Sequence, residues 1–224
     1  MNCLVPLWLT LKVAAVATTG AFVSGVGLAF LLARFKFPSR EWVDAVLTLP
    51  LVLPPTVLGY YLVVLVGRKG WIGQWLYEAF GISFMFTWQG AALAASLVSL
   101  PLVYKASRAA FEGVDGNLEK AARSLGSSEI EVFFCVSFPL AWRGILAGTM
   151  VAFARAMGEF GATLMVAGNL PGKTQTLSLA VYDAVQAGND HLATVLVLIT
   201  SFVCVAVLVA SSKMFKTNYL KETA

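Results

Sequence analysis

The sequence predicts an all-α integral membrane protein with about five transmembrane helices. Hydrophobic residues fill 58% of its 224 positions and charged residues only 12%, whereas soluble globular proteins carry about 25% charged residues. Several apolar runs reach the roughly 20 residues that an α-helix needs to cross the hydrocarbon core of a bilayer. The sequence contains no internal repeat or low-complexity tract, so residues 1–224 are expected to form one membrane domain.

Five apolar runs are long enough to span the membrane. We place the spans at about 13–33, 45–67, 80–104, 144–167 and 192–212. Four of these runs have no charged residue, and the fourth in chain order carries Arg155 and Glu159. A sixth, re-entrant segment within 174–187 stays open as an alternative.

The distribution of lysine and arginine predicts the orientation, because these residues are enriched in cytoplasmic loops. Eleven lie in or beside the first and third loops and the C-terminal segment, against three in the second and fourth loops. The basic-rich side has Arg34, Lys36, Arg40, Lys105, Arg108, Lys120, Arg123, Arg143, Lys213, Lys216 and Lys221; the other side has Arg68, Lys69 and Lys173. The N-terminus is therefore expected outside and the C-terminus inside. Lys12 disagrees with this orientation, and the bias elsewhere outweighs it.

The net charge of +4 does not indicate a nucleic-acid-binding protein. The basic residues gather in short loops between apolar runs, and membrane topology accounts for that pattern. The three cysteines, Cys3, Cys135 and Cys204, have no metal-binding spacing. We therefore expect no metal site and no cofactor.

Three prolines interrupt the second span, in the stretch LTLPLVLPPTVLGYY. Each proline removes a backbone donor and disfavours a regular helix at the preceding residue. Within a bilayer, the freed carbonyls need partners in protein or in a water-filled cavity. Two interpretations stay open: a kinked helix used for packing, or a broken helix that lines a translocation path. In the second, Pro54, Pro55 and Thr56 are path candidates.

Arg155 and Glu159 are four residues apart, so they are expected to lie on one face of the fourth span. Charged groups inside a membrane are costly and usually face protein or water. They are expected either to form a neutralised pair that fixes helix packing or to guide an anion along a path. Since conduction requires weak binding sites, an arginine already paired with a carboxylate suits transient passage.

A charged, helix-forming stretch, EKAARSLGSSEIEVFFCVSFP, follows the third span on the predicted cytoplasmic side. A short helix over 118–125 is expected, with Asn117 as its N-cap and Gly126 as a left-handed C-cap. Ser128 and Glu131 have the spacing of a capping box that starts a second helix. Together these features predict a helix–turn–helix elbow at the membrane surface.

The residue spacing of this elbow, within a cytoplasmic segment at 112–139, resembles the EAA loop of ABC importer permeases, EAA-x3-G-x9-I-x-L-P. The matching residues are Glu119, Ala121, Ala122, Gly126 and Pro139. In that family, the small alanines let a short coupling helix enter a groove of the cytoplasmic ATPase, and the glycine sets the angle between the two helices. The resemblance implies that these five residues couple the chain to an ATPase. Pro139 is expected to break the second helix.

The chain departs from this motif at three positions. Lys120 stands where the motif has glutamate, and the acidic residue is its neighbour Glu119. Val136 replaces isoleucine and Phe138 replaces leucine. The architecture is still expected, while the role of Glu119 stays open.

A second stretch, FARAMGEFGAT at 153–163, resembles the signature of the molybdate and sulfate branch of these permeases. The segments LPLVLPPTVLGYYL, RKGWIG, WLYEAFGISFMFTWQGA and FEGVD are also similar to the molybdate permeases in content and order, and the resemblance runs from about residue 10 to residue 212. It implies a type I ABC importer permease fold in a bacterial inner membrane.

The same resemblance implies a pore-forming subunit without catalysis of its own, which moves molybdate by alternating access. Its implied partners are a second copy of the chain, two ATPase subunits and a periplasmic molybdate-binding protein. A sulfate or tungstate permease of the same branch is the nearest alternative. An ATP-independent channel or a membrane scaffold is the alternative from another class.

Overall fold

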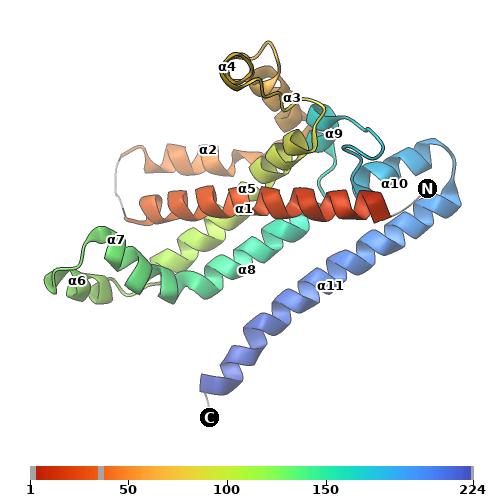
Figure 1. Cartoon of the computed structure of the whole chain (residues 1–224). Coiled ribbons are helices and arrows are strands. Elements are labelled where there is room, and N and C mark those ends of the chain that lie inside the picture. The colour runs from red at the N-terminus through yellow and green to blue at the C-terminus, as the bar shows by residue number, and fades with distance from the viewer. Residues whose placement is uncertain (1–3, 35–37, 223–224) are drawn as a thin grey trace.

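The computed structural model describes residues 4–34 and 38–222, with side chains as far as residue 209. Lys36, which contributes to the predicted orientation, lies outside the described residues, and so do the side chains of Lys213, Lys216 and Lys221. The described chain contains helices and connecting segments and no strand (Figure 1). The helices are α1 (Leu4–Arg34), α2 (Arg40–Val52), α3 (Pro55–Val66), α4 (Trp71–Phe80), α5 (Trp88–Glu112), α6 (Gly116–Ser124), α7 (Glu129–Val132), the π-helix η1 (Phe133–Ser137), α8 (Phe138–Met157), α9 (Gly161–Ala167), α10 (Leu177–Gln186) and α11 (Asp190–Glu222).

Four helical segments of the described chain are long and apolar enough to cross a membrane: α1, α5, the run from α7 to α8, and α11. The pair α2 and α3 makes a fifth if its 114° bend is counted as a break within one span. The prediction of an all-α protein with about five spans is confirmed. The 174–187 segment forms α10, whose ten residues are about half the length that a span needs.

The centre of the fold is the packing of α1 against α5. Small residues line both helices at this contact: Ala14, Ala17, Ala21 and Gly25 on α1, and Ala91, Ala92 and Ala95 on α5. A side-chain carbon on Gly25 would lie 3.2 Å from Cβ of Val103, so the two backbones are already close. Helices in lipid associate through this kind of close small-residue packing, because burial of apolar surface gives them no advantage there.

The two ends of the helix bundle differ. At one end lie the C-terminus of α1, the start of α2 and the elbow helices α6 and α7 (Figure 1, left). At the other end lie the N-terminus of α1, α10 and the start of α11 (Figure 1, right). Lys12 belongs to this second end, where its ammonium lies 3.6 Å from the ring centroid of Trp88. The elbow and the α9–α10 segment are therefore on opposite sides of the bundle.

The helix boundaries differ from the predicted spans at several positions. The first helix begins at Leu4 rather than at residue 13, and the run 45–67 is broken between α2 and α3.

Two further differences lie in the later runs. The apolar run 80–104 does not start a helix at residue 80, because α5 begins at Trp88, where Thr87 caps it by accepting a hydrogen bond from the backbone N–H of Gly90. The run 144–167 is not one helix, since α8 ends at Met157 and α9 starts at Gly161. Apolar composition is continuous across the start of α5, so hydropathy gave no signal for that boundary. The second boundary contains Glu159, with Gly158 and Gly161 beside it, yet the surrounding run is apolar enough to predict one span.

Pro139 does not break the helix that contains it, which corrects the expectation from the sequence. The helical run continues from α7 through η1 into α8, and Pro139 is the second residue of α8. The N–H of Phe138 donates to the carbonyl of Phe133, five residues back. In a regular helix the proline ring would meet the carbonyl four residues earlier, and the widened π-helical turn accommodates it.

Candidate functional site

The elbow is formed by α6 and α7, joined through a four-residue turn. Asp115, not Asn117, caps α6, because its carboxylate accepts a hydrogen bond from the backbone N–H of Asn117 at 2.9 Å. The helix therefore starts earlier than predicted, at Gly116. Ser128 and Glu131 form the predicted capping box of α7, with both reciprocal hydrogen bonds present.

Gly126 turns the chain between the two short helices. Its φ is +91°, a conformation that glycine adopts without the strain other residues incur. The N–H of Gly126 donates to the carbonyl of Arg123 and the N–H of Ser127 to the carbonyl of Ala122, which is the hydrogen-bond pattern of a Schellman C-cap. The positive φ expected at this residue is observed.

Glu119 points into the protein, with a residue exposure of only 2%. Its carboxylate forms an ion pair with Arg34, the last residue of α1. The hydroxyl of Ser137 donates to Oε1 of Glu119 at 2.7 Å, and Arg34 donates to the same hydroxyl at 2.8 Å. These three residues therefore join the elbow to the end of α1 and to η1.

Arg34 and Ser137 were not predicted as site residues from the sequence. Arg34 contributed only to the orientation, as one basic residue of the first loop, and it is 85 positions from Glu119. The sequence did contain one signal. Glu119 lies on a short helix between two apolar spans, and a carboxylate that becomes buried there needs a cationic partner. To identify that partner as Arg34, one must know that the end of α1 lies beside η1, which only the structure shows.

A second ion pair holds the two elbow helices at their angle. Arg123 of α6 donates to both carboxylate oxygens of Glu129 of α7, from Nε at 2.5 Å and from Nη2 at 3.1 Å. This two-point geometry fixes orientation as well as distance. The hydrogen bond with Glu129 also raises the pKa of Arg123 above its ordinary value.

The other predicted elbow residues lie on its surface or at its edge. Ala121 and Pro139 are exposed, and Ala122 is half-buried. Leu118 and Leu125 are also exposed, Leu125 at 88%. The elbow thus presents small and apolar side chains outward, while its carboxylate Glu119 is turned inward.

The second candidate region is the meeting point of two helix breaks. One break separates α2 from α3, where Pro54 is the N-cap and Pro55 the first residue of α3. The other separates α8 from α9. A side-chain carbon on Gly161, the first residue of α9, would lie 3.0 Å from Cβ of Pro55 and 3.4 Å from the backbone nitrogen of Thr56. The fold therefore brings Pro55 and Thr56 beside the segment that contains Glu159.

Arg155 and Glu159 do not lie on one continuous helix, because α8 ends at Met157. They are still paired: Nη1 of Arg155 lies 2.9 Å from Oε2 of Glu159. That oxygen accepts no aligned hydrogen bond from the described residues, so the contact is mainly electrostatic. The other oxygen, Oε1, accepts from the N–H of Ala162 at 3.0 Å, which satisfies a free donor at the start of α9.

The exposures of these residues differ. The side chain of Glu159 is 2% exposed and that of Arg155 is 37% exposed. Pro54 and Thr56 are exposed, and Pro55 is half-buried. Irregular backbone at membrane depth is tolerated where protein buries it or where it lines a water-filled cavity. The α2–α3 break is thus partly exposed, and so is Arg155 of the neighbouring α8–α9 segment.

A model of one protein family matches residues 25–217, which is most of the chain. Its description is "Binding-protein-dependent transport system inner membrane component". The chain belongs to this family. With its apolar helices, the permease is a multi-pass inner-membrane protein, and it is a transport subunit rather than a catalytic one.

Within this family, the chain is similar to permeases of molybdenum transport systems. The permease is 50% identical to the molybdenum transport system permease protein ModB of Escherichia coli (strain K12). The aligned 178 residues cover 80% of the permease and 78% of that relative. It is 46% identical over 178 residues to ModB of Haemophilus influenzae, with the same shares covered. A solved structure of the MetNI methionine ABC transporter in inward facing conformations has a TM-score of 0.71 at 16% identity, covering 94% of the permease and 93% of that chain. This last likeness shows the fold, that of ABC importer permeases.

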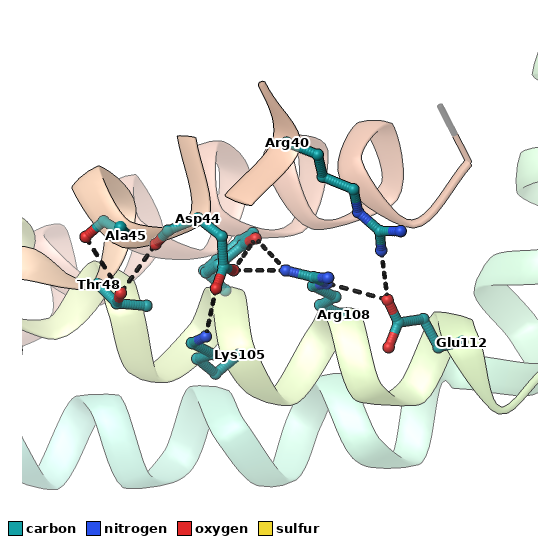
Figure 2. Close-up of polar contacts among 8 residues, drawn as sticks. Arg40, Asp44, Ala45, Thr48, Lys105, Arg108 and Glu112 are labelled. Carbon is teal, nitrogen blue, oxygen red and sulfur yellow. Dashed lines mark hydrogen bonds and ion pairs between the residues drawn. The ribbon is translucent and has the colours of Figure 1, made fainter. Parts of the chain in front are cut away.

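A polar network in the permease joins α2 to α5 at the elbow end (Figure 2). The carboxylate of Asp44 accepts hydrogen bonds from the hydroxyl of Tyr104 at 2.6 Å, Nζ of Lys105 at 2.8 Å and Nη1 of Arg108 at 2.5 Å. Glu112 extends the network, accepting from Nε of Arg108 at 2.9 Å and from Arg40 at 2.6 Å. No residue of α2 is fully buried, but Val43 and Leu47 pack partly buried against the core. The charges therefore act together with this apolar contact to attach α2 to α5.

Proposed function

We propose that this permease is the membrane subunit of an ATP-driven importer of molybdate. The observation that carries the proposal is its 50% identity to a molybdenum transport permease over 80% of the chain. The sulfate alternative is not favoured, because both ModB relatives named above are molybdenum transport permeases. The implied assembly has two copies of the permease, two ATPase subunits and a periplasmic molybdate-binding protein.

In this proposal the elbow receives the motion of the ATPase. Closure of the ATPase dimer on ATP moves α6 and α7, and the pathway opens outward to accept the oxyanion. The contact of Glu119 with Arg34 carries the motion into α1, and its contact with Ser137 carries it into the helix that continues as α8. Release of the hydrolysis products returns the permease to the inward-facing state.

The two adjacent helix breaks are the proposed translocation path. Pro54 lies at the first break and Pro55 and Thr56 begin α3, with Pro54 and Thr56 exposed, and Arg155 supplies a partly exposed positive charge in the neighbouring α8–α9 segment. The pairing with Glu159 weakens the attraction of Arg155 for an oxyanion, and weak sites favour passage over trapping. Selectivity among oxyanions is then assigned mainly to the binding protein.

Uptake measurements test this function. In a bacterial strain that lacks its own molybdate, sulfate and tungstate permeases, the chain is supplied with its ATPase and binding protein, and uptake of each labelled oxyanion is measured. We expect molybdate uptake that disappears when the ATPase is omitted or inactivated. Uptake without the ATPase would indicate a channel, and preferential uptake of sulfate or tungstate would change the assigned substrate.

The proposed orientation places the N-terminus in the periplasm and the C-terminus in the cytoplasm. In a cysteine-free background, single cysteines at Ser39 and Gly116, which are exposed at the elbow end, should resist an impermeant thiol reagent on whole cells. Cysteines at the exposed positions Gln74 and Lys173 should be labelled. All four should react after the membrane is permeabilised, which controls for accessibility. The inverted labelling pattern would reverse the orientation.

A further inference from the structure

The helix α4 exposes most of its apolar side chains. It lies at the margin of the bundle, packs mainly on the end of α3 and buries only Gly73 (Figure 1). Trp71 and Trp75 are one turn apart on this helix, with exposures of 86% and 60%, and Phe80 at its end is also exposed. Tryptophan is enriched where a membrane protein meets the boundary between hydrocarbon and headgroups. The exposed surface of α4 therefore has the composition of a surface in contact with lipid.

Two cations without a carboxylate partner precede α4. Arg68 and Lys69 are exposed in the turn that joins α3 to α4. Arg68 lies over the ring of Tyr77, with its Cζ 5.9 Å from the ring centroid, and no carboxylate among the described residues pairs with either cation. The one acid of α4, Glu78, instead accepts a hydrogen bond from the amide of Gln74. Both cations are therefore available to an anion from outside the chain.

A groove of about 600 Å³ opens beside these cations. Arg68 and Lys69 line it together with Val63 and Val64 of α3 and with Phe86, which precedes α5. Phe86 is exposed, and its φ of +58° is a left-handed conformation that is uncommon for an aromatic residue. The groove therefore combines apolar walls, one of them an exposed aromatic ring, with two cations.

We propose that this groove binds one phospholipid from the membrane leaflet opposite the elbow, with a preference for an anionic headgroup. Arg68 and Lys69 bind the headgroup phosphate, and the apolar walls hold the start of an acyl chain. Clustered lysine and arginine side chains at a membrane surface attract anionic headgroups. Lipid is favoured over a soluble partner because α4, which follows directly in the chain, exposes the aromatic side chains typical of the headgroup boundary. The site does not depend on which oxyanion the permease transports.

Lipid binding to the full-length permease in detergent tests this site, with native mass spectrometry counting the lipids bound. We expect one saturable site per chain for phosphatidylglycerol and weaker binding of the zwitterionic phosphatidylcholine. The double variant Arg68→Gln with Lys69→Gln should lower the affinity for phosphatidylglycerol roughly tenfold, towards that for phosphatidylcholine. Lys173→Gln, which removes an exposed cation on the same predicted side of the membrane, is the matched control and should bind both lipids normally.

Phe86→Gly separates the groove from the stability of the fold. Glycine adopts the positive φ of this position without strain, so the unfolding temperature without added lipid should not fall, while the affinity for both lipids should. Unchanged phosphatidylglycerol binding in this variant and in the double variant would indicate non-specific lipid adhesion only and would overturn the site. Equal binding of the two lipids by the unaltered permease would overturn the anionic preference. Normal lipid binding by the double variant, with weaker binding of the periplasmic molybdate-binding protein, would assign the two cations to a protein contact instead.

Discussion

Replacing Gly126 by valine is expected to abolish ATP-driven uptake while the permease stays in the membrane at a near-normal level. Gly126 has a φ of +91°, and a side chain added there would meet open space. The strain is therefore in the backbone, about 1–2 kcal/mol for an L-residue in the left-handed region and more for a β-branched one. The turn can relieve that strain by changing the angle between α6 and α7, on which docking depends.

Gly116→Val is the matched control for this prediction. Gly116 also belongs to the elbow and also faces open space, but its φ is not positive. It should therefore retain uptake and bind the ATPase. The measurements are the amount of permease in the membrane, the ATPase that co-purifies with it, and labelled molybdate uptake. If Gly126→Val kept a full complement of ATPase and normal uptake, the elbow would not be the coupling site.

Arg155→Ala is expected to cause the largest loss of folded protein. It leaves the carboxylate of Glu159, 2% exposed, with only the N–H of Ala162 as a partner. Leaving a buried carboxylate without its cationic partner costs about 3 kcal/mol. The expected result is a lower yield and a lower unfolding temperature in detergent, measured by fluorescence-detected gel filtration after heating.

The double variant Arg155→Ala with Glu159→Gln separates the two roles considered for this pair. Glutamine removes the unpaired charge and keeps an oxygen that can accept from Ala162, so most of the folded protein should return. Near-normal uptake by this double variant would identify a structural pair. A well-folded double variant with poor uptake would identify Arg155 as a guide for the anion. Normal yield and normal uptake in Arg155→Ala alone would contradict both roles.

The sequence predicted features that depend on residues close together in the chain. The apolar runs gave the membrane class, and Gly126, Ser128 and Glu131 gave the turn and the capping box because caps and turns are set by neighbouring side chains. Asn117 was predicted as the N-cap of α6, but the observed N-cap is Asp115, two residues earlier. Asp and Asn are equally good N-caps, so local preference could not choose between Asn117 and Asp115.

Features that depend on packing could not be predicted in this way. The break at 158–160 lies within a run whose hydropathy favours a helix, and it exists where Gly161 packs against Pro55. Pro139 was predicted to end a helix, but a π-helical turn accommodates it. The burial of Glu119 depends on Arg34, and hydropathy cannot show which loop lies beside which.

The network around Asp44 has a consequence for how α2 can move. Val43 and Leu47 of α2 pack partly buried against the core, so separating α2 from α5 exposes some apolar surface. The same step also separates Asp44 from Lys105 and Arg108, whose side chains are partly exposed. Dissolved salt screens charges that solvent can reach. An α2 displacement in this permease should therefore become easier as ionic strength rises.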